Sequence, residues 1–327
     1  MNSPQRREFL ALGGALALSQ TFAAVAVGPP PAPPPPATAL PKMWLEAQRI
    51  TLWPADPPGG GGFAPQPLPP DWSPVFLRNV AKPDLRIFRP ARPNGQALLL
   101  VPGGAYRFVS VANEGVDVAQ RMLAYGVTVF VLTYRLPGEG WKDRADVPLQ
   151  DAQRAIRVIR SRASVLGIEA TKVSVLGFSA GGHLAATLAT DHSARVYEPV
   201  DTADELDPRP CAAGLIYPVV TMEKPLTHEL SRTLLLGDAP RDAEVVRRSA
   251  ERHVDSTTPP TFIVHAFDDP AVPVENSLRF MNAMRAAQRP VEAHLLQEGG
   301  HAFGVGHPGS PSAHWIELFW SWLQRVS

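Results

Sequence analysis

The sequence KVSVLGFSAGGHLAATLAT, residues 172–190, decides how this chain is interpreted. Its first part is an apolar run that predicts a buried strand, and its second part is rich in small residues that favour a helix. Ser179 lies where the two meet, with Gly177 two residues before it and Gly181 two residues after it. The pattern predicts a serine in a tight turn between a strand and a helix.

The five residues 177–181 fit the pattern G-x-S-x-G, in which a serine in a strained turn presents its hydroxyl above a sheet. Small flanking residues are required because the strand and helix backbones pass close to each other. The free N–H groups of the helix N-terminus also favour a developing negative charge. The alternative is a glycine-rich turn with an incidental serine, and the strand before it and helix after it argue against that alternative.

The composition excludes several classes of function. The chain has 327 residues, of which 45% are hydrophobic and 19% are charged, as in a globular protein with a large core. Lys+Arg and Asp+Glu both number 31, so no excess charge is available to attract nucleic acid or an acidic membrane surface. Cys211 is the single cysteine and cannot form an internal disulfide. We expect a small or polymeric neutral substrate and no nucleic-acid partner.

The N-terminal sequence MNSPQRREFLALGGALALSQTFAAVAVG is typical of an export signal. The paired arginines resemble the twin-arginine motif, and the small residues near Ala26 suit cleavage. We predict a signal peptide over residues 1–26, a proline-rich linker over residues 27–41, and a periplasmic or extracellular location without stable membrane insertion. An uncleaved membrane anchor is the alternative.

Strand and helix patterns alternate regularly after residue 75, and several of the strands are apolar on both faces. This indicates an α/β fold of one domain, residues 42–327, with a mostly parallel central sheet and helices on both faces. The predicted strands are residues 75–80, 84–90, 96–102, 127–134, 172–178, 212–218, 261–267 and 291–297. The predicted helices are residues 113–125, 148–163, 180–190, 242–253, 274–287 and 311–324. The segment 54–70 is rich in proline and glycine, and we expect it to wrap loosely over the edge of the domain. Trp53 and Trp72 could hold it there.

A nucleophilic serine needs a histidine base and a carboxylate, which follow the serine along the chain in this type of fold. His301 lies in a glycine-flanked loop after the last strand and is the best placed of nine histidines. His307 and His314 are the alternatives, and the spacing of these three histidines matches no zinc pattern. For the carboxylate we choose Asp269 over Asp268, and expect the second aspartate to cap the turn before Pro270.

The reaction also requires N–H donors that stabilise an oxyanion. The predicted strand 96–102 ends in a glycine pair, which lets the backbone of Gly104 and Ala105 turn its N–H groups inward. The N–H group of Ala180, at the start of the next helix, would complete the site. An ordinary glycine turn is the alternative.

Six motifs together give a resemblance to a known family over residues 87–323: VPGGAY, VFVLTYRLP, DAQRAIRVIR, VLGFSAGGHLAATLA, PPTFIVHAFDDPAVPVENSL and GGHAFG. The chain resembles the α/β-hydrolase superfamily, in its branch of secreted acetylxylan-esterase-like carbohydrate esterases. The resemblance implies a Ser179, Asp269 and His301 triad, removal of acetyl groups from plant polysaccharides, and no metal or other cofactor. The sequence departs from the family at Pro102, where relatives with H-G-G-G have histidine, and at Ala302, where glycine is frequent.

The substrate is less well specified than the reaction. Tyr106, Tyr134 and Trp141 follow predicted strands, where their rings would pack on sugars; ordinary loop packing is the alternative. Residues 218–258 are a polar excursion without the apolar surface of a lipase lid. A serine peptidase of the same fold and a non-catalytic envelope binding protein are the rival functions.

Overall fold

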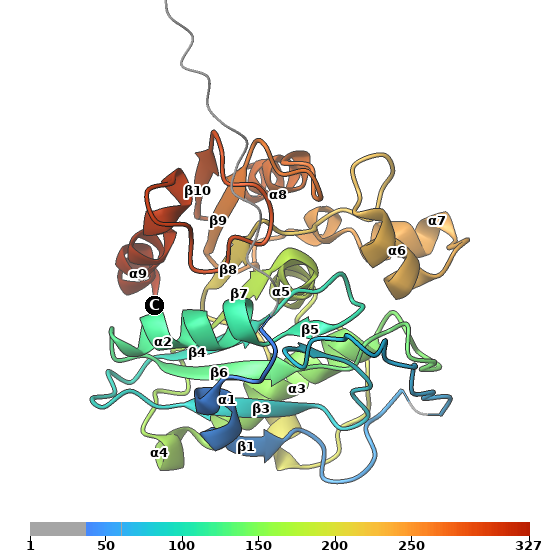
Figure 1. Cartoon of the computed structure of the whole chain (residues 1–327), viewed down its shortest axis with the longest axis horizontal. Coiled ribbons are helices and arrows are strands. Elements are labelled where there is room, and N and C mark those ends of the chain that lie inside the picture. Colours follow the sequence, from blue (N-terminus) through green and yellow to red (C-terminus); the bar gives the residue numbers. More distant parts are fainter. Residues whose placement is uncertain (1–36, 60) are drawn as a thin grey trace, which may run out of the picture. The chain divides into compact units, whose positions relative to one another are not determined.

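An eight-stranded sheet runs through the protein in the computed structural model, which describes residues 37–59 and 61–327 (Figure 1). The five pairings among β6, β4, β7, β8, β9 and β10 are parallel, whereas β1 and β3 pair antiparallel at one edge. The predicted fold class, a mostly parallel sheet, is confirmed. The strand order is β1 (Gln48–Thr51), β3 (Asp84–Phe88), β6 (Thr128–Thr133), β4 (Ala97–Val101), β7 (Val173–Phe178), β8 (Ala213–Ile216), β9 (Thr261–Ala266) and β10 (Val291–Leu296).

Helices cover both faces of the sheet, which is why its central strands are apolar on both sides. Every residue of β4, β6 and β7 is buried. The helices are α1 (Lys42–Glu46), α2 (Asp117–Leu123), α3 (Val147–Ser161), α4 (Ala163–Leu166), α5 (Ser179–Thr190), α6 (Glu229–Leu236), α7 (Asp242–Arg247), α8 (Glu275–Ala286) and α9 (Trp315–Val326).

The direction of the chain between strands determines which face each helix covers. The connection from β4 to β6, which contains α2, runs toward the β1 edge of the sheet. The connections that contain α3, α5 and α8 run toward the β10 edge. Right-handed crossovers therefore place α2 on one face and α3, α5 and α8 on the opposite face. Helix α9 returns to the face of α2, where Arg121 pairs with Glu317 at 2.8 Å and Tyr125 stacks on Trp320.

Several elements differ from those predicted. The strand predicted over residues 75–80 is reduced to β2 (Phe76–Leu77), which pairs with β5 (Val109–Ser110) in a separate two-stranded sheet. There Phe76 packs against Phe108, so its apolar character serves a small aromatic cluster and not the main sheet. Strand β1 and helices α1 and α6 were not predicted. Residues 112–116 form a π-helical turn before α2.

The segment 54–70 is held more firmly than its composition suggests. The Trp53 indole donates to Asp151 Oδ1 at 2.8 Å, and the Arg135 guanidinium donates to the carbonyl of Pro58. Phe63 packs on Trp141 with ring centroids 5.0 Å apart. Specific side-chain contacts, which a proline and glycine pattern does not reveal, hold this segment.

The predicted signal peptide and residues 27–36 of the predicted linker lie outside the described residues. The described residues belong to one compact unit. Within them, every helix is too short or too polar to cross a membrane.

Candidate active site

Ser179 lies at the carboxyl end of β7, where the strand turns directly into α5. Its φ of 50° is in the left-handed region, which strains any residue other than glycine. A Cβ atom on Gly177 would lie 2.3 Å from the carbonyl oxygen of Gly181, and one on Gly181 would lie 2.1 Å from that of Val101. Glycine is therefore required at both positions, because the backbones of β4, β7 and α5 are in contact around the serine.

Ser179, His301 and Asp269 form a continuous chain of hydrogen bonds. His301 Nε2 lies 2.9 Å from Ser179 Oγ, and His301 Nδ1 lies 2.7 Å from Asp269 Oδ2. The carboxylate can only accept, so the imidazole carries its proton on Nδ1 and Nε2 accepts the serine hydroxyl. The Asp269 side chain is fully buried, whereas that of His301 is 18% exposed. The structure thus brings together the three residues that the sequence analysis singled out.

Asp269 is anchored on both of its oxygen atoms. Oδ1 accepts the backbone N–H groups of Ala271 and Val272 at 2.8 and 2.9 Å, and Oδ2 is shared between His301 and His265. Burial by itself would raise the pKa of Asp269, but hydrogen bonds from His265 and His301 outweigh it and hold this pKa well below its usual range. The carboxylate is therefore charged and fixed opposite His301.

His265 supports Asp269 from inside the sheet. Its Nε2 faces Asp269 Oδ2 at 3.1 Å and the carbonyl of Val272 at 3.0 Å, so this nitrogen carries the proton. Its Nδ1 then accepts the hydroxyl of Ser277 at 2.8 Å. His265 is therefore a buried residue of β9 whose two ring nitrogens both have hydrogen-bond partners.

Asp268 has a different role from the one expected. Its Oδ1 accepts the N–H groups of Gly299 and Gly300 at 2.9 and 2.8 Å, and so fixes the loop that leads to His301. Asp269, not Asp268, caps the turn after Pro270. The expectation was wrong because one aspartate can cap a turn with one oxygen atom and hold a histidine with the other.

The loop after β4 passes close to Ser179, and a Cβ atom on its Gly103 would lie 2.9 Å from the Ser179 Cβ atom. Gly104 and Ala105 have φ values of 126° and 56°, and no described residue accepts a hydrogen bond from either N–H group. A Cβ atom on Gly104 would lie 2.2 Å from the carbonyl of Phe108, so glycine is needed there. The N–H group of Ala180, in the first turn of α5, has no partner inside the helix. The three N–H groups named in the sequence analysis thus have no acceptor among the residues that the structure describes.

A buried carboxylate that the sequence analysis missed lies behind this loop. Glu114 Oε2 accepts the N–H group of Gly103 at 2.7 Å, and Glu114 Oε1 accepts the hydroxyl of Tyr217 at 2.9 Å. The Tyr217 oxygen also accepts the N–H group of Gly304, and its ring packs edge-on against His301. Burial raises the pKa of Glu114, against the opposing effect of the Gly103 and Tyr217 hydrogen bonds. The only sequence signal was the position of Tyr217, directly after a strand at the same edge.

The three aromatic residues expected to pack on sugars are instead buried. The Tyr134 hydroxyl donates to the carbonyl of Pro102 at 2.9 Å, and Trp141 lies against Phe63 and the Arg135 guanidinium. Tyr106 is 1% exposed. The expectation is corrected here: these rings are part of the protein interior, because the hydroxyls of Tyr106 and Tyr134 and the ring of Trp141 already contact other side chains or backbone within the protein.

Tyr106 is held by a second buried histidine. Its hydroxyl donates to His183 Nδ1 at 2.7 Å, while His183 Nε2 donates to the carbonyl of Arg248 at 2.7 Å. Burial lowers the pKa of His183 to about 4, which keeps the ring neutral. The start of α5 and the loop after β4 are thus joined through Tyr106.

The other histidines considered as a base do not reach Ser179. The backbone N–H group of His307 donates to Ser312 Oγ, and His314 lies in the short turn before α9. Among residues 37–59 and 61–327, no group of three histidine, cysteine, aspartate or glutamate side chains is arranged to hold a metal ion.

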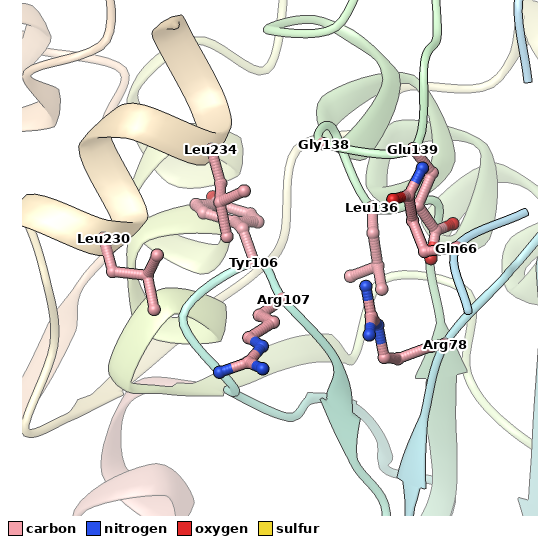
Figure 2. A pocket seen from close by; sticks show the side chains of 9 residues that line it. All are labelled: Gln66, Arg78, Tyr106, Arg107, Leu136, Gly138, Glu139, Leu230 and Leu234. Atoms are coloured by element: carbon pink, nitrogen blue, oxygen red, sulfur yellow. The ribbon is translucent and has the colours of Figure 1, made fainter. Parts of the chain in front are cut away.

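A cavity of about 210 Å³ adjoins the loop after β4 (Figure 2). Tyr106 and Arg107 of this loop line it, and Leu230 and Leu234 of α6 form an apolar wall. Arg78 lies opposite them, close to Glu139 (Figure 2). The excursion between β8 and β9 therefore contributes to a cavity that also includes Tyr106 and Arg107 of the loop after β4.

The chain is similar to proteins named as an acetylxylan esterase and a xylanase. An acetylxylan esterase from Xylanibacter ruminicola is 33% identical over 254 residues, which are 76% of this chain and 50% of the relative. Endo-1,4-beta-xylanase B from Butyrivibrio fibrisolvens is 35% identical over 210 residues, 64% of this chain and 33% of that protein. The chain thus spans half or less of the length of these curated relatives.

Solved structures extend the comparison to the fold. The acetyl ester-xyloside bifunctional hydrolase from Caldicellulosiruptor lactoaceticus superimposes with a TM-score of 0.71 at 30% identity, over 86% of this chain and 96% of that one. The family model BD-FAE matches residues 85–284, a span that begins within β3 and contains β4 to β9, Ser179 and Asp269. Because this model matches more than half of the chain and the fold is that of an α/β-hydrolase, we conclude that the chain belongs to the BD-FAE family.

Proposed function

We propose that this protein is a serine carboxylesterase that removes acetyl or other short acyl groups from carbohydrate esters such as acetylated xylan. The observation that carries the proposal is the hydrogen-bond chain from Ser179 through His301 to Asp269, beside the free N–H groups of Gly104 and Ala105. A nucleophile, a base, a carboxylate and an oxyanion site are the full set of groups that acyl transfer requires.

The reaction has two halves. His301 Nε2 accepts the Ser179 proton while Oγ attacks the ester carbonyl carbon, and the oxyanion is stabilised by the N–H groups of Gly104, Ala105 and Ala180. His301 then donates this proton to the leaving sugar oxygen, which breaks the ester bond and leaves an acyl group on Ser179. Water repeats the sequence, releases the acid and restores the serine.

Asp269 keeps the imidazole in the tautomer that the first half needs and stabilises its charged form afterwards. Activity requires a neutral His301, so it falls at acidic pH. Each N–H donor of the oxyanion site contributes about 3 kcal/mol to the stabilisation of the transition state. No cofactor takes part in either half of this scheme.

The sugar part of the substrate is proposed from the relatives, whose names include an acetylxylan esterase and an acetyl ester-xyloside hydrolase. The cavity of about 210 Å³ has room for little more than a sugar unit or a short acyl chain, and its walls carry charged as well as apolar side chains. This favours a polar carbohydrate ester over a lipid.

We also propose that residues 1–26 are a cleaved twin-arginine signal and that the catalytic domain, residues 42–327, acts in the periplasm or outside the cell. The support is the sequence RREFL followed by an apolar run and small residues. Changing both Arg6 and Arg7 to lysine should retain the full-length precursor in the cytoplasm. Mature enzyme found outside the cytoplasm in that variant would contradict the proposal.

The test of the activity compares three substrates: acetylated xylan, a feruloylated oligosaccharide and an aminoacyl anilide. We expect release of acetate from the first and no cleavage of the anilide. Ser179→Ala should lower kcat by about 10⁴-fold or more and should lose labelling by a serine-directed phosphonate, with an unchanged circular dichroism spectrum. Cleavage of the anilide alone would favour a peptidase, and full turnover by Ser179→Ala would exclude this mechanism.

A further inference from the structure

Two arginine side chains line the cavity beside the oxyanion loop without an acidic partner. Arg78 directly follows β2 and Arg107 lies in the loop after β4, so the two come from different segments of the chain (Figure 2). Within residues 37–59 and 61–327, neither guanidinium forms an ion pair with a carboxylate, and the buried Nε of Arg78 has no hydrogen-bond partner. Unpaired cations in a concave site favour binding of an anion.

Trp72 holds both arginines in place. The guanidinium carbon of Arg78 lies 5.2 Å from the centroid of the Trp72 ring, and that of Arg107 lies 5.5 Å from it. The Trp72 indole is itself fixed by donating to the carbonyl of Phe76 at 2.7 Å. Two like charges near one ring repel each other, and binding of an anion in the cavity would offset this repulsion.

Glu139, the carboxylate that lines the cavity, already accepts hydrogen bonds from the protein backbone. Glu139 accepts the backbone N–H groups of Asn79 and Val80 at 2.6 and 3.1 Å. Its two oxygen atoms therefore fix the backbone next to Arg78, although its charge also acts on that arginine. The rest of the opposite wall is apolar, from Leu230 and Leu234.

The arginine pair is close to the reacting ester. The N–H group of Arg107 donates to the carbonyl of Gly104 at 2.8 Å, which closes a tight turn. In such a turn the Cα atoms of the first and fourth residues are less than about 7 Å apart. Gly104 is the proposed oxyanion donor, so Arg107 belongs to the same turn as the proposed oxyanion site.

We propose that this cavity binds the carboxylate of a uronic-acid unit on the sugar substrate, so that the enzyme prefers acyl esters next to an acidic sugar. Arg78 and Arg107 bind the carboxylate, and the α6 leucines pack against the ring that carries it. The inference rests on the proposed esterase function and specifies its substrate.

The experiment compares two substrates that differ in one charge. One is an acetylated xylo-oligosaccharide with a glucuronic-acid side group, and the other carries the corresponding uronamide. Acetate release should show a kcat/KM about tenfold higher for the acid, because hydrogen bonds to charged groups are worth more than neutral ones. In about 1 M NaCl the preference should fall toward one, since the two charges are then screened.

Variants identify the residues responsible. Arg78→Gln and Arg107→Gln should each reduce the preference for the acid, whereas Arg195→Gln, an exposed arginine beyond the far end of α5, should retain it. Equal kcat/KM for acid and amide in the unaltered enzyme overturns the inference and leaves the esterase function standing. Release of acetate from neither substrate overturns both.

Discussion

The Tyr217 hydroxyl donates to Glu114 Oε1 at 2.9 Å deep behind the reacting serine. Through Glu114 Oε2 and the N–H group of Gly103, this pair reaches the oxyanion loop; through the N–H group of Gly304, it reaches the loop of His301. Two loops about 200 residues apart in the sequence are thereby held at a fixed separation by one buried polar pair.

Tyr217→Phe removes this connection. Glu114 Oε1 and the N–H group of Gly304 each lose a buried partner, so we expect the free energy of unfolding to fall by about 1–3 kcal/mol. We also expect kcat to fall about tenfold with a smaller change in KM, because the two loops no longer hold the transition-state geometry. Tyr125→Phe, on a ring stacked at the surface, is the control. An unchanged kcat in Tyr217→Phe would show that the pair does not position the site.

The two neighbouring aspartates should respond differently to the same change. Asp269→Asn should lower kcat by about 10⁴-fold, because an amide does not fix the tautomer of His301 as a carboxylate does. Asp268→Asn keeps an oxygen atom that can accept both N–H groups of residues 299 and 300, and we expect less than about a tenfold loss. Steady-state kinetics of both variants test the assignment, and the reverse order of effects would reject it.

Gly181 should not tolerate even one added methyl group. In Gly181→Ala the new Cβ atom would lie 2.1 Å from the carbonyl oxygen of Val101, which forces β4 and α5 apart. We expect a loss of about 3 kcal/mol or more in stability, or no soluble protein. Gly167→Ala has open space around its Cβ position and should lose only about 1–2 kcal/mol, from its left-handed backbone. Thermal unfolding that gave equal losses would contradict the close backbone contact.

The pair of Arg135 and Asp151 is fully buried, with nitrogen and oxygen 2.8 Å apart. Asp151→Ala leaves the arginine charge without a partner in the core, and also releases the Trp53 indole. We expect a loss of about 3–5 kcal/mol in chemical denaturation. Glu46→Ala, which breaks an exposed pair with Lys42, should lose less than about 0.5 kcal/mol. Similar values for the two variants would refute this ranking.

Stability should depend on pH through His183. Burial lowers its pKa in the folded protein to about 4, below the usual value near 6.5, so the unfolded chain binds the proton more readily. The free energy of unfolding should therefore fall as the pH is lowered from about 6.5 toward about 4, by about 3 kcal/mol at most. Denaturation curves of His183→Gln should be flatter over this interval. An equally steep pH dependence in the variant would assign the effect to other groups.

The sequence predicted strands correctly where the pattern of apolar residues matches the burial found in the structure. Strands β4, β6 and β7 are apolar on both faces, and Ser179, Asp269 and His301 each follow a predicted strand, so their shared edge could be anticipated. Glu114 and Tyr217 could not be paired, because their contact depends on packing between residues far apart in the chain. Strand β1 was missed because QRIT carries only one buried side chain.

Helix α6 supplies two leucines to the cavity wall, yet it lies in a connection that contributes no strand to the sheet (Figure 1). The residues proposed to carry the chemistry are on the sheet and its edge loops, so α6 adds a wall to the cavity without contributing to the nucleophile, its base or its carboxylate. Substitutions in this connection can therefore change the apolar wall of the cavity, and with it the shape of the ester that fits, without altering Ser179, His301 or Asp269.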